Sequence, residues 1–147
     1  MTNKKILVVD DDPDVRKGMH LRLAANDYDT CFAADGVTAI AEARKQKPDL
    51  IILDLGLPAG DGFGVMERLK AIPTLDVIPI IVISARDAFA NKSFALNAGA
   101  KAFLQKPVDN SQFLAVIRQT LGEAAPPKKS VVYDLDLCDD VLPSLSS

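Results

Sequence analysis

The sequence predicts a single α/β domain over residues 1–122, built as a doubly wound, five-stranded parallel sheet with helices on both faces. Two observations predict this fold. Short apolar runs of strand length alternate five times with longer stretches of helical period, which is the pattern of a parallel sheet. Three of these runs, at residues 6–9, 49–53 and 78–83, are dominated by aliphatic residues, as is typical of strands buried on both faces.

Each element can be placed in chain order. Strands are expected at residues 6–9, 28–33, 49–53, 78–83 and 102–104. Helices are expected from residue 13 toward residue 26, from Asp35-Gly36 to a stop at Lys47-Pro48, over residues 63–72 and 88–97, and from about residue 110 to about residue 121. The second and fifth strands are the less apolar ones, so we expect them nearer the edges of the sheet.

Capping and turn residues indicate where the helices begin and end. Asp12 before Pro13 is a good N-cap followed by a proline at the first helical position. Asp35 precedes the second helix, and Asp109 or Asn110 precedes the last. The ends of the helices are marked by a proline or a glycine, at Pro48, Pro73, Gly99 and Gly122.

Composition and charge exclude several classes of protein. The net charge is -3, and no basic block is present, which argues against direct binding of nucleic acid. Two cysteines do not make a disulfide framework, and Cys31 lies in a strand-like run where a reduced, buried thiol is expected. No apolar run approaches the roughly 18 residues that cross a bilayer, and the N-terminus lacks a signal-peptide core. We therefore expect a cytoplasmic protein.

Polar residues follow four of the predicted strands. Asp10 and Asp11 come after the first strand, Asp54 after the third, Ser84 after the fourth and Lys106 after the fifth. Because ligands of parallel α/β sheets bind beyond the carboxyl ends of the strands, we expect three carboxylates, a hydroxyl and an ammonium group to converge there.

Such a cluster favours a particular chemistry. Carboxylates that lie this close raise one another's pKa unless a cation offsets them, and Mg²⁺ suits a site with few protein ligands and several waters. A carboxylate beside Mg²⁺ and a lysine can act as a nucleophile toward phosphorus and form an acyl phosphate. Asp12 is better explained as a helix cap than as a ligand, and Ser84 or Lys106 alone would be unremarkable. The combination is what is specific.

Four separated segments then resemble one known family. These are Leu7 to Pro13 (LVVDDDP), Pro48 to Leu55 (PDLIILDL) with Leu57-Pro58 and Asp61-Gly62, Ile83-Ser84-Ala85, and Gly99-Ala100 followed by Lys106-Pro107. Over roughly residues 4–122 the chain resembles the receiver domain of two-component response regulators. The resemblance implies a (βα)5 flavodoxin-like or CheY-like domain with strand order 2-1-3-4-5.

The resemblance also implies which residues bind the metal and the phosphoryl group. Asp54 would be the phosphoacceptor. Asp11 and Asp54 would bind Mg²⁺ directly, the backbone carbonyl of Gly56 would complete the protein ligands, and Asp10 would act mainly through water. Where many family members carry a larger residue, this chain has Gly56, which bears on how readily water reaches the phosphoryl group.

A second set of residues would carry the switch. Lys106 would pair with the phosphoryl oxygens, and the Lys106-Pro107 peptide bond would be cis. Ser84 would move to hydrogen-bond the phosphoryl group, and Phe103, where Tyr is common in the family, would turn inward behind it. The altered face would be formed by the fourth predicted helix, the fifth strand and the fifth helix. Residues expected on it are Phe89, Lys92, Phe103, Val108 and Phe113, of which the apolar ones are expected mostly in the core.

The implied partners are proteins. A sensor histidine kinase or a histidine phosphotransfer protein would donate the phosphoryl group, and a downstream protein or a second copy of the chain would bind the altered face. The chain is expected to have no catalytic output of its own and to bind neither nucleic acid nor membrane.

Residues 123–147 are expected to form a linker and a short acidic and apolar tail. They include five acidic and two basic residues, and Pro126-Pro127 is typical of a linker. The tail is too short to fold alone. A disordered end, a docking peptide and the start of a missing output domain all stay open.

Three rival functions are weaker. An aspartate-nucleophile phosphatase typically has a second acid two residues after the nucleophile, where this chain has Gly56. A flavin-binding protein needs a phosphate-cradling loop after the first strand, where Asp10, Asp11 and Asp12 would repel a phosphate. A structural pseudo-receiver is disfavoured because neither the acceptor, the acids nor the lysine is missing.

Overall fold

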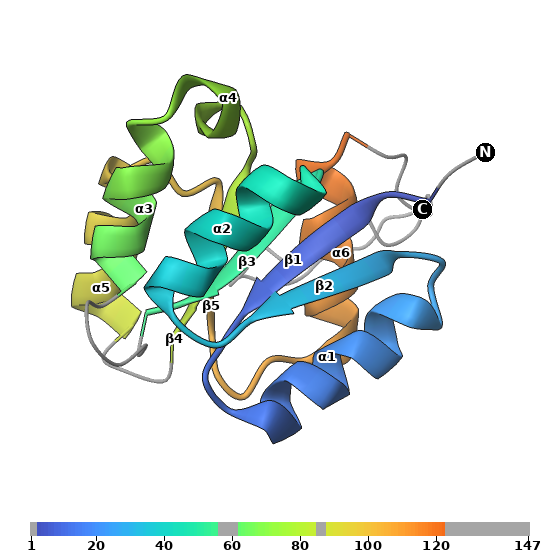
Figure 1. Cartoon of the computed structure of the whole chain (residues 1–147). Helices are drawn as coiled ribbons and strands as arrows, with labels where there is room; N and C mark the ends of the chain where they lie inside the picture. The colour runs from blue at the N-terminus through green and yellow to red at the C-terminus, as the bar shows by residue number, and fades with distance from the viewer. Residues whose placement is uncertain (1–2, 56–61, 85–87, 123–147) are drawn as a thin grey trace. The chain divides into compact units, whose positions relative to one another are not determined.

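Five short aliphatic runs form a parallel sheet in the computed structural model, which describes residues 3–55, 62–84 and 88–122 (Figure 1). The strands are β1 (Lys5–Val9), β2 (Asp29–Ala33), β3 (Leu50–Asp54), β4 (Ile80–Ser84) and β5 (Ala102–Gln105). They lie in the order β2-β1-β3-β4-β5, and every neighbouring pair is parallel. The predicted strand order, and the places of the second and fifth strands at the edges, are confirmed.

Helices connect and follow the strands. They are α1 (Pro13–Ala24), α2 (Gly36–Gln46), α3 (Gly62–Lys70), α4 (Pro73–Asp76), α5 (Ala88–Asn97) and α6 (Asn110–Thr120). The chain divides into two compact units, one from Met1 to Pro107 with the sheet and α1 to α5, and one from Val108 onward with α6. The domain boundary expected at residue 122 stays a prediction.

Aspartate caps begin three of the helices as the sequence predicts. The side chain of Asp12 accepts a hydrogen bond from the backbone N–H of Asp14 at the start of α1. Asp35 accepts from Thr38 at the start of α2. At the start of α6, Asp109 accepts from the N–H of Gln112. Each cap satisfies a backbone donor that the first helical turn leaves without an intrahelical partner.

The segment between α3 and β4 differs from the prediction. The helix predicted over residues 63–72 ends at Lys70, and a separate helical turn, α4, begins at Pro73. Proline is well suited to the first position of a helix, so Pro73 starts a helix instead of only ending one. The fourth strand then begins at Ile80, because the N–H of Ile78 donates to the carbonyl of Leu75 and closes a turn.

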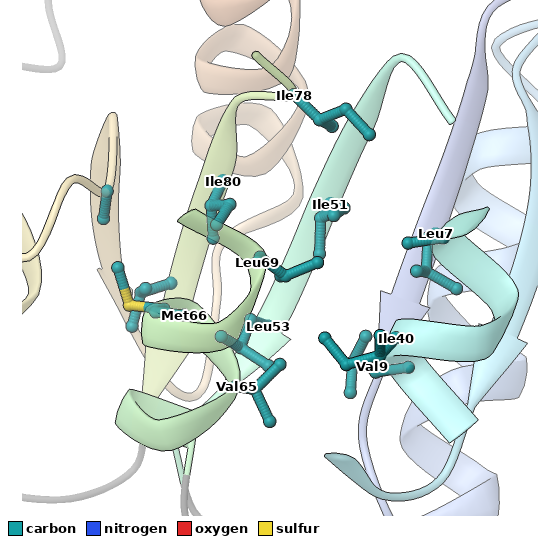
Figure 2. Packing of buried hydrophobic residues seen from close by; sticks show 14 of the residues in the cluster. Leu7, Val9, Ile40, Ile51, Leu53, Val65, Met66, Leu69, Ile78 and Ile80 are labelled. Carbon is teal, nitrogen blue, oxygen red and sulfur yellow. The ribbon is translucent and has the colours of Figure 1, made fainter. Parts of the chain in front are cut away.

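Alternate residues of the central strands build the core beneath α2 and α3. Figure 2 shows Leu7, Ile51 and Ile80 of the sheet facing Ile40 of α2 and Leu69 of α3. These strand residues are 0–1% exposed. On the other side of the sheet, α1 packs against β1 and β2 (Figure 1). This packing on both sides holds the central strands, and hence the positions of the residues at their carboxyl ends.

Candidate functional site

The carboxyl ends of four strands bring the predicted polar residues together. Asp10 follows β1 directly, Asp54 and Ser84 are the last residues of β3 and β4, and Lys106 follows β5. Three of them lie inside the protein, since Asp10 is 2% exposed, Asp54 7% and Ser84 0%. Buried polar groups are stabilised only when they are partnered, so the contacts of this cluster determine what it can do.

Every polar atom of Asp10 takes part in a hydrogen bond. Its Oδ1 accepts from the backbone N–H of Asp12 at 2.9 Å, and its Oδ2 accepts from Nζ of Lys106 at 2.9 Å. Its own N–H donates to the carbonyl of Ala33, and its carbonyl accepts from Nη1 of Arg16 at 2.7 Å. Each carboxylate oxygen of Asp10 thus accepts one hydrogen bond, and these contacts fix the side chain at the end of β1.

Lys106 links the ends of three strands. Its ammonium lies 2.9 Å from Oδ2 of Asp10 and 3.5 Å from Oδ2 of Asp54. Its backbone N–H donates to the carbonyl of Ser84 at 2.9 Å. The Lys106-Pro107 peptide bond is cis, the isomer that the family resemblance implies. The ammonium is thus placed between two buried carboxylates.

Burial and charge shift the pKa values of both Asp10 and Lys106. Burial raises the pKa of the Asp10 carboxyl, and the hydrogen bonds from Asp12 and Lys106 only partly offset it. Burial works to lower the pKa of Lys106, but the carboxylates of Asp10 and Asp54 outweigh it and raise that pKa. Lys106 accordingly stays protonated, while a charged Asp10 costs free energy that a nearby cation can offset.

The donor set fits a hard divalent cation. One carboxylate oxygen from each of Asp10, Asp11 and Asp54 lies within 4.8 Å of the others. Asp11 is exposed, whereas Asp10 and Asp54 are buried. Oxygen-only donors with an opening to water match the preference of Mg²⁺, which keeps several of its waters. Lys106 supplies one positive charge against three carboxylates, so a second cation would bring the cluster closer to neutrality.

Other residues predicted to matter lie in different settings. Phe103 of β5 is half-buried and packs against the core cluster. Lys92 is exposed, Val108 is half-buried and Phe113 is fully buried. Gly56 and Cys138 lie outside the described residues, and so does the side chain of Phe89. Cys31 is half-buried and not fully buried as expected; burial raises the pKa of its thiol to about 11.

Two residues near the cluster have no role predicted from the sequence, although Gly62 belongs to the Asp61-Gly62 segment that carries the resemblance. Arg16 reaches from α1 to the backbone of Asp10, and its position one turn after the N-cap Asp12 is the only signal for it in the sequence. Gly62 begins α3 beside the end of β3. Glycine is a poor helix former, so its place at the start of a helix hints at a spatial constraint.

The fold and the cluster define an α/β protein that places an acidic rim against the ammonium group of Lys106 at the ends of parallel strands. A sequence model of the response regulator receiver domain matches residues 6–118. The chain belongs to this family, the receiver domains of two-component response regulators. Receiver domains interact with histidine kinases and with downstream partners.

Individual relatives agree with this assignment. The response regulator MprA of Mycobacterium sp. strain KMS is 37% identical over 139 residues, which cover 92% of this chain and 60% of MprA. The chain therefore spans about 60% of the length of that relative. A CheY-like receiver domain protein from Methanospirillum hungatei is 29% identical with a TM-score of 0.75, covering 82% of this chain and 95% of the other.

A third relative bears on the metal. The receiver domain of the sensor histidine kinase PA1611 from Pseudomonas aeruginosa is 27% identical, with a TM-score of 0.75 over 83% of this chain and 100% of the other. That domain has a magnesium ion coordinated in its active-site cleft.

In residues 3–55, 62–84 and 88–122 of this chain, no helix is long and apolar enough to cross a membrane.

Proposed function

We propose that the chain accepts a phosphoryl group on Asp54 in a Mg²⁺-dependent reaction and that this changes its affinity for a partner protein. The observation that carries the proposal is the place of Asp54, buried at the end of β3, 3.5 Å from the ammonium of Lys106. Its carboxylate is also part of the cluster with Asp10 and Asp11. A carboxylate in these surroundings can act as a nucleophile toward phosphorus.

The proposed donor is a sensor histidine kinase or a histidine phosphotransfer protein. An oxygen of Asp54 attacks the phosphorus of a phosphohistidine, and a new O–P bond forms as the P–N bond breaks. The electron pair of the broken bond stays on the imidazole nitrogen. Lys106 neutralises charge on the phosphoryl oxygens, which is the main requirement of phosphoryl transfer.

Mg²⁺ is the proposed cofactor. Asp11 and Asp54 are its direct ligands in this proposal, with the backbone carbonyl of Gly56, because both oxygens of Asp10 already accept hydrogen bonds. Asp10 then acts through water and by holding Lys106. When bound, Mg²⁺ supplies positive charge beside the oxygens of the transferring group.

Ser84 and Phe103 are the proposed switch. Ser84 ends β4 beside Lys106 and is fully buried, and Phe103 is half-buried on the neighbouring strand β5. A hydrogen bond from the Ser84 hydroxyl to the phosphoryl group draws that side chain toward Asp54, and Phe103 turns inward behind it. Such a local charge event biases a packing change between two states. We propose that a downstream protein or a second copy of the chain reads the change at a surface that includes α5 and β5.

We further propose that residues 1–122 form the receiver and that residues 123–147 form a linker and tail. In this proposal neither part catalyses a downstream reaction. The activity promoted by the receiver is then limited to its own phosphorylation and dephosphorylation. A cytoplasmic location is part of the same proposal.

Intact-mass measurement after incubation with Mg²⁺ and acetyl phosphate tests the proposal. We expect one added phosphoryl group on the wild type, none on Asp54→Asn, and none on the wild type when EDTA replaces Mg²⁺. Calorimetric titration should show that Asp11→Asn binds Mg²⁺ much more weakly than the wild type. A phosphoryl group on Asp54→Asn would refute the acceptor, and unchanged affinity in Asp11→Asn would refute the ligand.

A further inference from the structure

Gly62, the first residue of α3, lies against the backbone at the end of β3. A Cβ atom added at Gly62 would be 2.7 Å from Cα of Leu55 and 2.9 Å from the carbonyl oxygen of Asp54. Both atoms belong to the main chain, so no change of rotamer could relieve the overlap. A third contact, 2.9 Å to Cδ2 of Leu55, involves the end of a flexible side chain. There is therefore no room for a side chain at residue 62 beside the backbone of Asp54 and Leu55.

The segment that Gly62 touches cannot easily move aside. The N–H of Leu55 donates to the carbonyl of Ile83 on β4 at 3.1 Å, which holds the end of β3 on its far side. The N–H of Gly62 lies 3.4 Å from the carbonyl of Leu55. The Asp54-Leu55 peptide is thus enclosed between β4 and the start of α3, and a side chain at residue 62 would displace either the peptide or the helix.

The direction of the Asp54 side chain depends on the position of the Asp54-Leu55 peptide. The Asp54 carboxylate lies 3.5 Å from Nζ of Lys106 and within 4.8 Å of the carboxylate oxygens of Asp10 and Asp11. A shift of a few tenths of an ångström at the Asp54 carbonyl would change these separations together. Chemistry on a positioned nucleophile is sensitive to such shifts, since a misplacement of about 1 Å can cost roughly 100-fold in rate.

We propose that Gly62 is a positioning residue for the phosphoacceptor: by having no side chain, it lets α3 begin against the Asp54 carbonyl and so fixes the carboxylate toward Lys106 and the acidic cluster. The inference rests on the function proposed above. It assigns to Gly62 an effect on phosphoryl acceptance and metal binding that goes beyond an effect on stability.

The chain offers a matched control in Gly18. It is also a helical glycine, on α1, but a Cβ atom added there would have no neighbour within 4 Å. Gly18→Ala therefore adds the same methyl group to a helix with no overlap, and the better helix propensity of alanine should leave stability equal or slightly higher. Any difference between Gly62→Ala and Gly18→Ala reflects the space around residue 62.

The experiment measures full-length Gly62→Ala and Gly18→Ala beside the wild type. Circular dichroism melts give the folded fraction, and intact-mass time courses with acetyl phosphate at saturating Mg²⁺ give the rate of phosphorylation per folded molecule. We expect Gly18→Ala to match the wild type and Gly62→Ala to be about 10–100-fold slower at saturating acetyl phosphate. We expect the concentration of acetyl phosphate for half-maximal rate to change little. Equal rates per folded molecule in the two variants would overturn the proposal.

A double variant separates the two backbone contacts of a residue-62 side chain from its contact with the Leu55 side chain. Leu55→Ala removes the flexible Cδ2 contact but leaves the two backbone contacts, so Leu55→Ala/Gly62→Ala should stay slow relative to Leu55→Ala alone. Recovery of the Leu55→Ala rate in the double variant would show that only a side-chain contact matters, and the proposal would fail.

Titration with Mg²⁺ separates this inference from the function proposed above. If the wild type accepts no phosphoryl group, the proposed function is lost, but the metal affinity still tests Gly62. We expect weaker Mg²⁺ binding in Gly62→Ala than in Gly18→Ala. Equal affinities would overturn the positioning role by themselves.

Discussion

The same strands build two regions of opposite character. Beneath α2 and α3, the side chains of β1, β3 and β4 form an apolar core with exposures of 0–1%. One residue further along each chain segment, at the carboxyl ends, the side chains are polar and two buried carboxylates share one ammonium group. On β3, Leu53 belongs to the core and its neighbour Asp54 to the cluster.

The difference shows how stability and function are divided in this fold. Each core side chain stabilises the folded state in proportion to the apolar area that it removes from water. The cluster works the other way for Asp10, because burial raises its pKa and so disfavours its charged form. Changes in the core should therefore alter stability and spare the chemistry, while changes in the cluster should alter both or only the chemistry.

The largest effect on stability is expected in the core. Leu69 of α3 is 1% exposed, and Figure 2 shows it directed toward Ile51 of β3. Leu69→Ala should lower the free energy of unfolding by about 2–5 kcal/mol, because it removes buried methyl groups and leaves a cavity. Urea unfolding followed by circular dichroism measures the change through the shift in midpoint at unchanged slope.

A neighbouring residue on the same helix provides the control. Glu67 is exposed, so Glu67→Ala should change stability by no more than roughly 0.5 kcal/mol. In buffer where both variants are folded, Leu69→Ala should bind Mg²⁺ as tightly as the wild type. A weakened metal affinity in Leu69→Ala would mean that core and cluster are coupled and would break the comparison.

A smaller loss is expected from the lysine of the cluster. Lys106→Met keeps most of the side-chain volume but leaves the carboxylates of Asp10 and Asp54 without their ammonium partner. At neutral pH this should cost about 1–3 kcal/mol of unfolding free energy, the range for a buried polar group that loses its partner. Lys101→Met makes the same chemical change at an exposed residue and should be nearly neutral.

The pH dependence of this loss has a definite sign. The folded-state pKa of Asp10 is raised above its ordinary value, so the fold favours the protonated acid and loses stability as pH rises through that pKa. Without Lys106 the carboxylate is still less favourable, so the gap between wild type and Lys106→Met should widen with rising pH. Unfolding curves across acidic pH measure it; a gap that narrows would contradict the charge assignment.

The main features of the fold follow from the sequence because they depend on local patterns. Continuous aliphatic runs place the central strands, and the aspartates at residues 12, 35 and 109 place three helix starts. The helical turn α4 is missed because Pro73 is interpreted only as a helix stop, although a proline can also begin a helix. One residue type allows both outcomes, and the tertiary setting decides between them.

The site is predictable to the level of which residues meet, but not of which atoms pair. The rule that ligands bind beyond the carboxyl ends of parallel strands brings Asp10, Asp54, Ser84 and Lys106 together. That Lys106 lies 2.9 Å from Asp10 but 3.5 Å from Asp54 depends on side-chain geometry at a scale that no spacing in the sequence encodes. The close approach of Gly62 to the Asp54 carbonyl is equally a property of the packed structure.

The smallest effect separates two neighbouring acids of the rim. Asp12 caps α1 by accepting from the N–H of Asp14 at 2.9 Å, whereas Asp11 is the one grouped with Asp10 and Asp54. Asp12→Ala should lower stability by about 1 kcal/mol, while Asp12→Asn, which keeps a good cap, should be close to neutral. Both Asp12 variants should retain Mg²⁺ affinity in calorimetric titration, whereas Asp11→Ala should lose affinity with little loss of stability.

The two residues are adjacent and both exposed. A common effect of surface charge would therefore change metal binding equally in Asp11→Ala and Asp12→Ala. Only distinct roles as ligand and cap give opposite results.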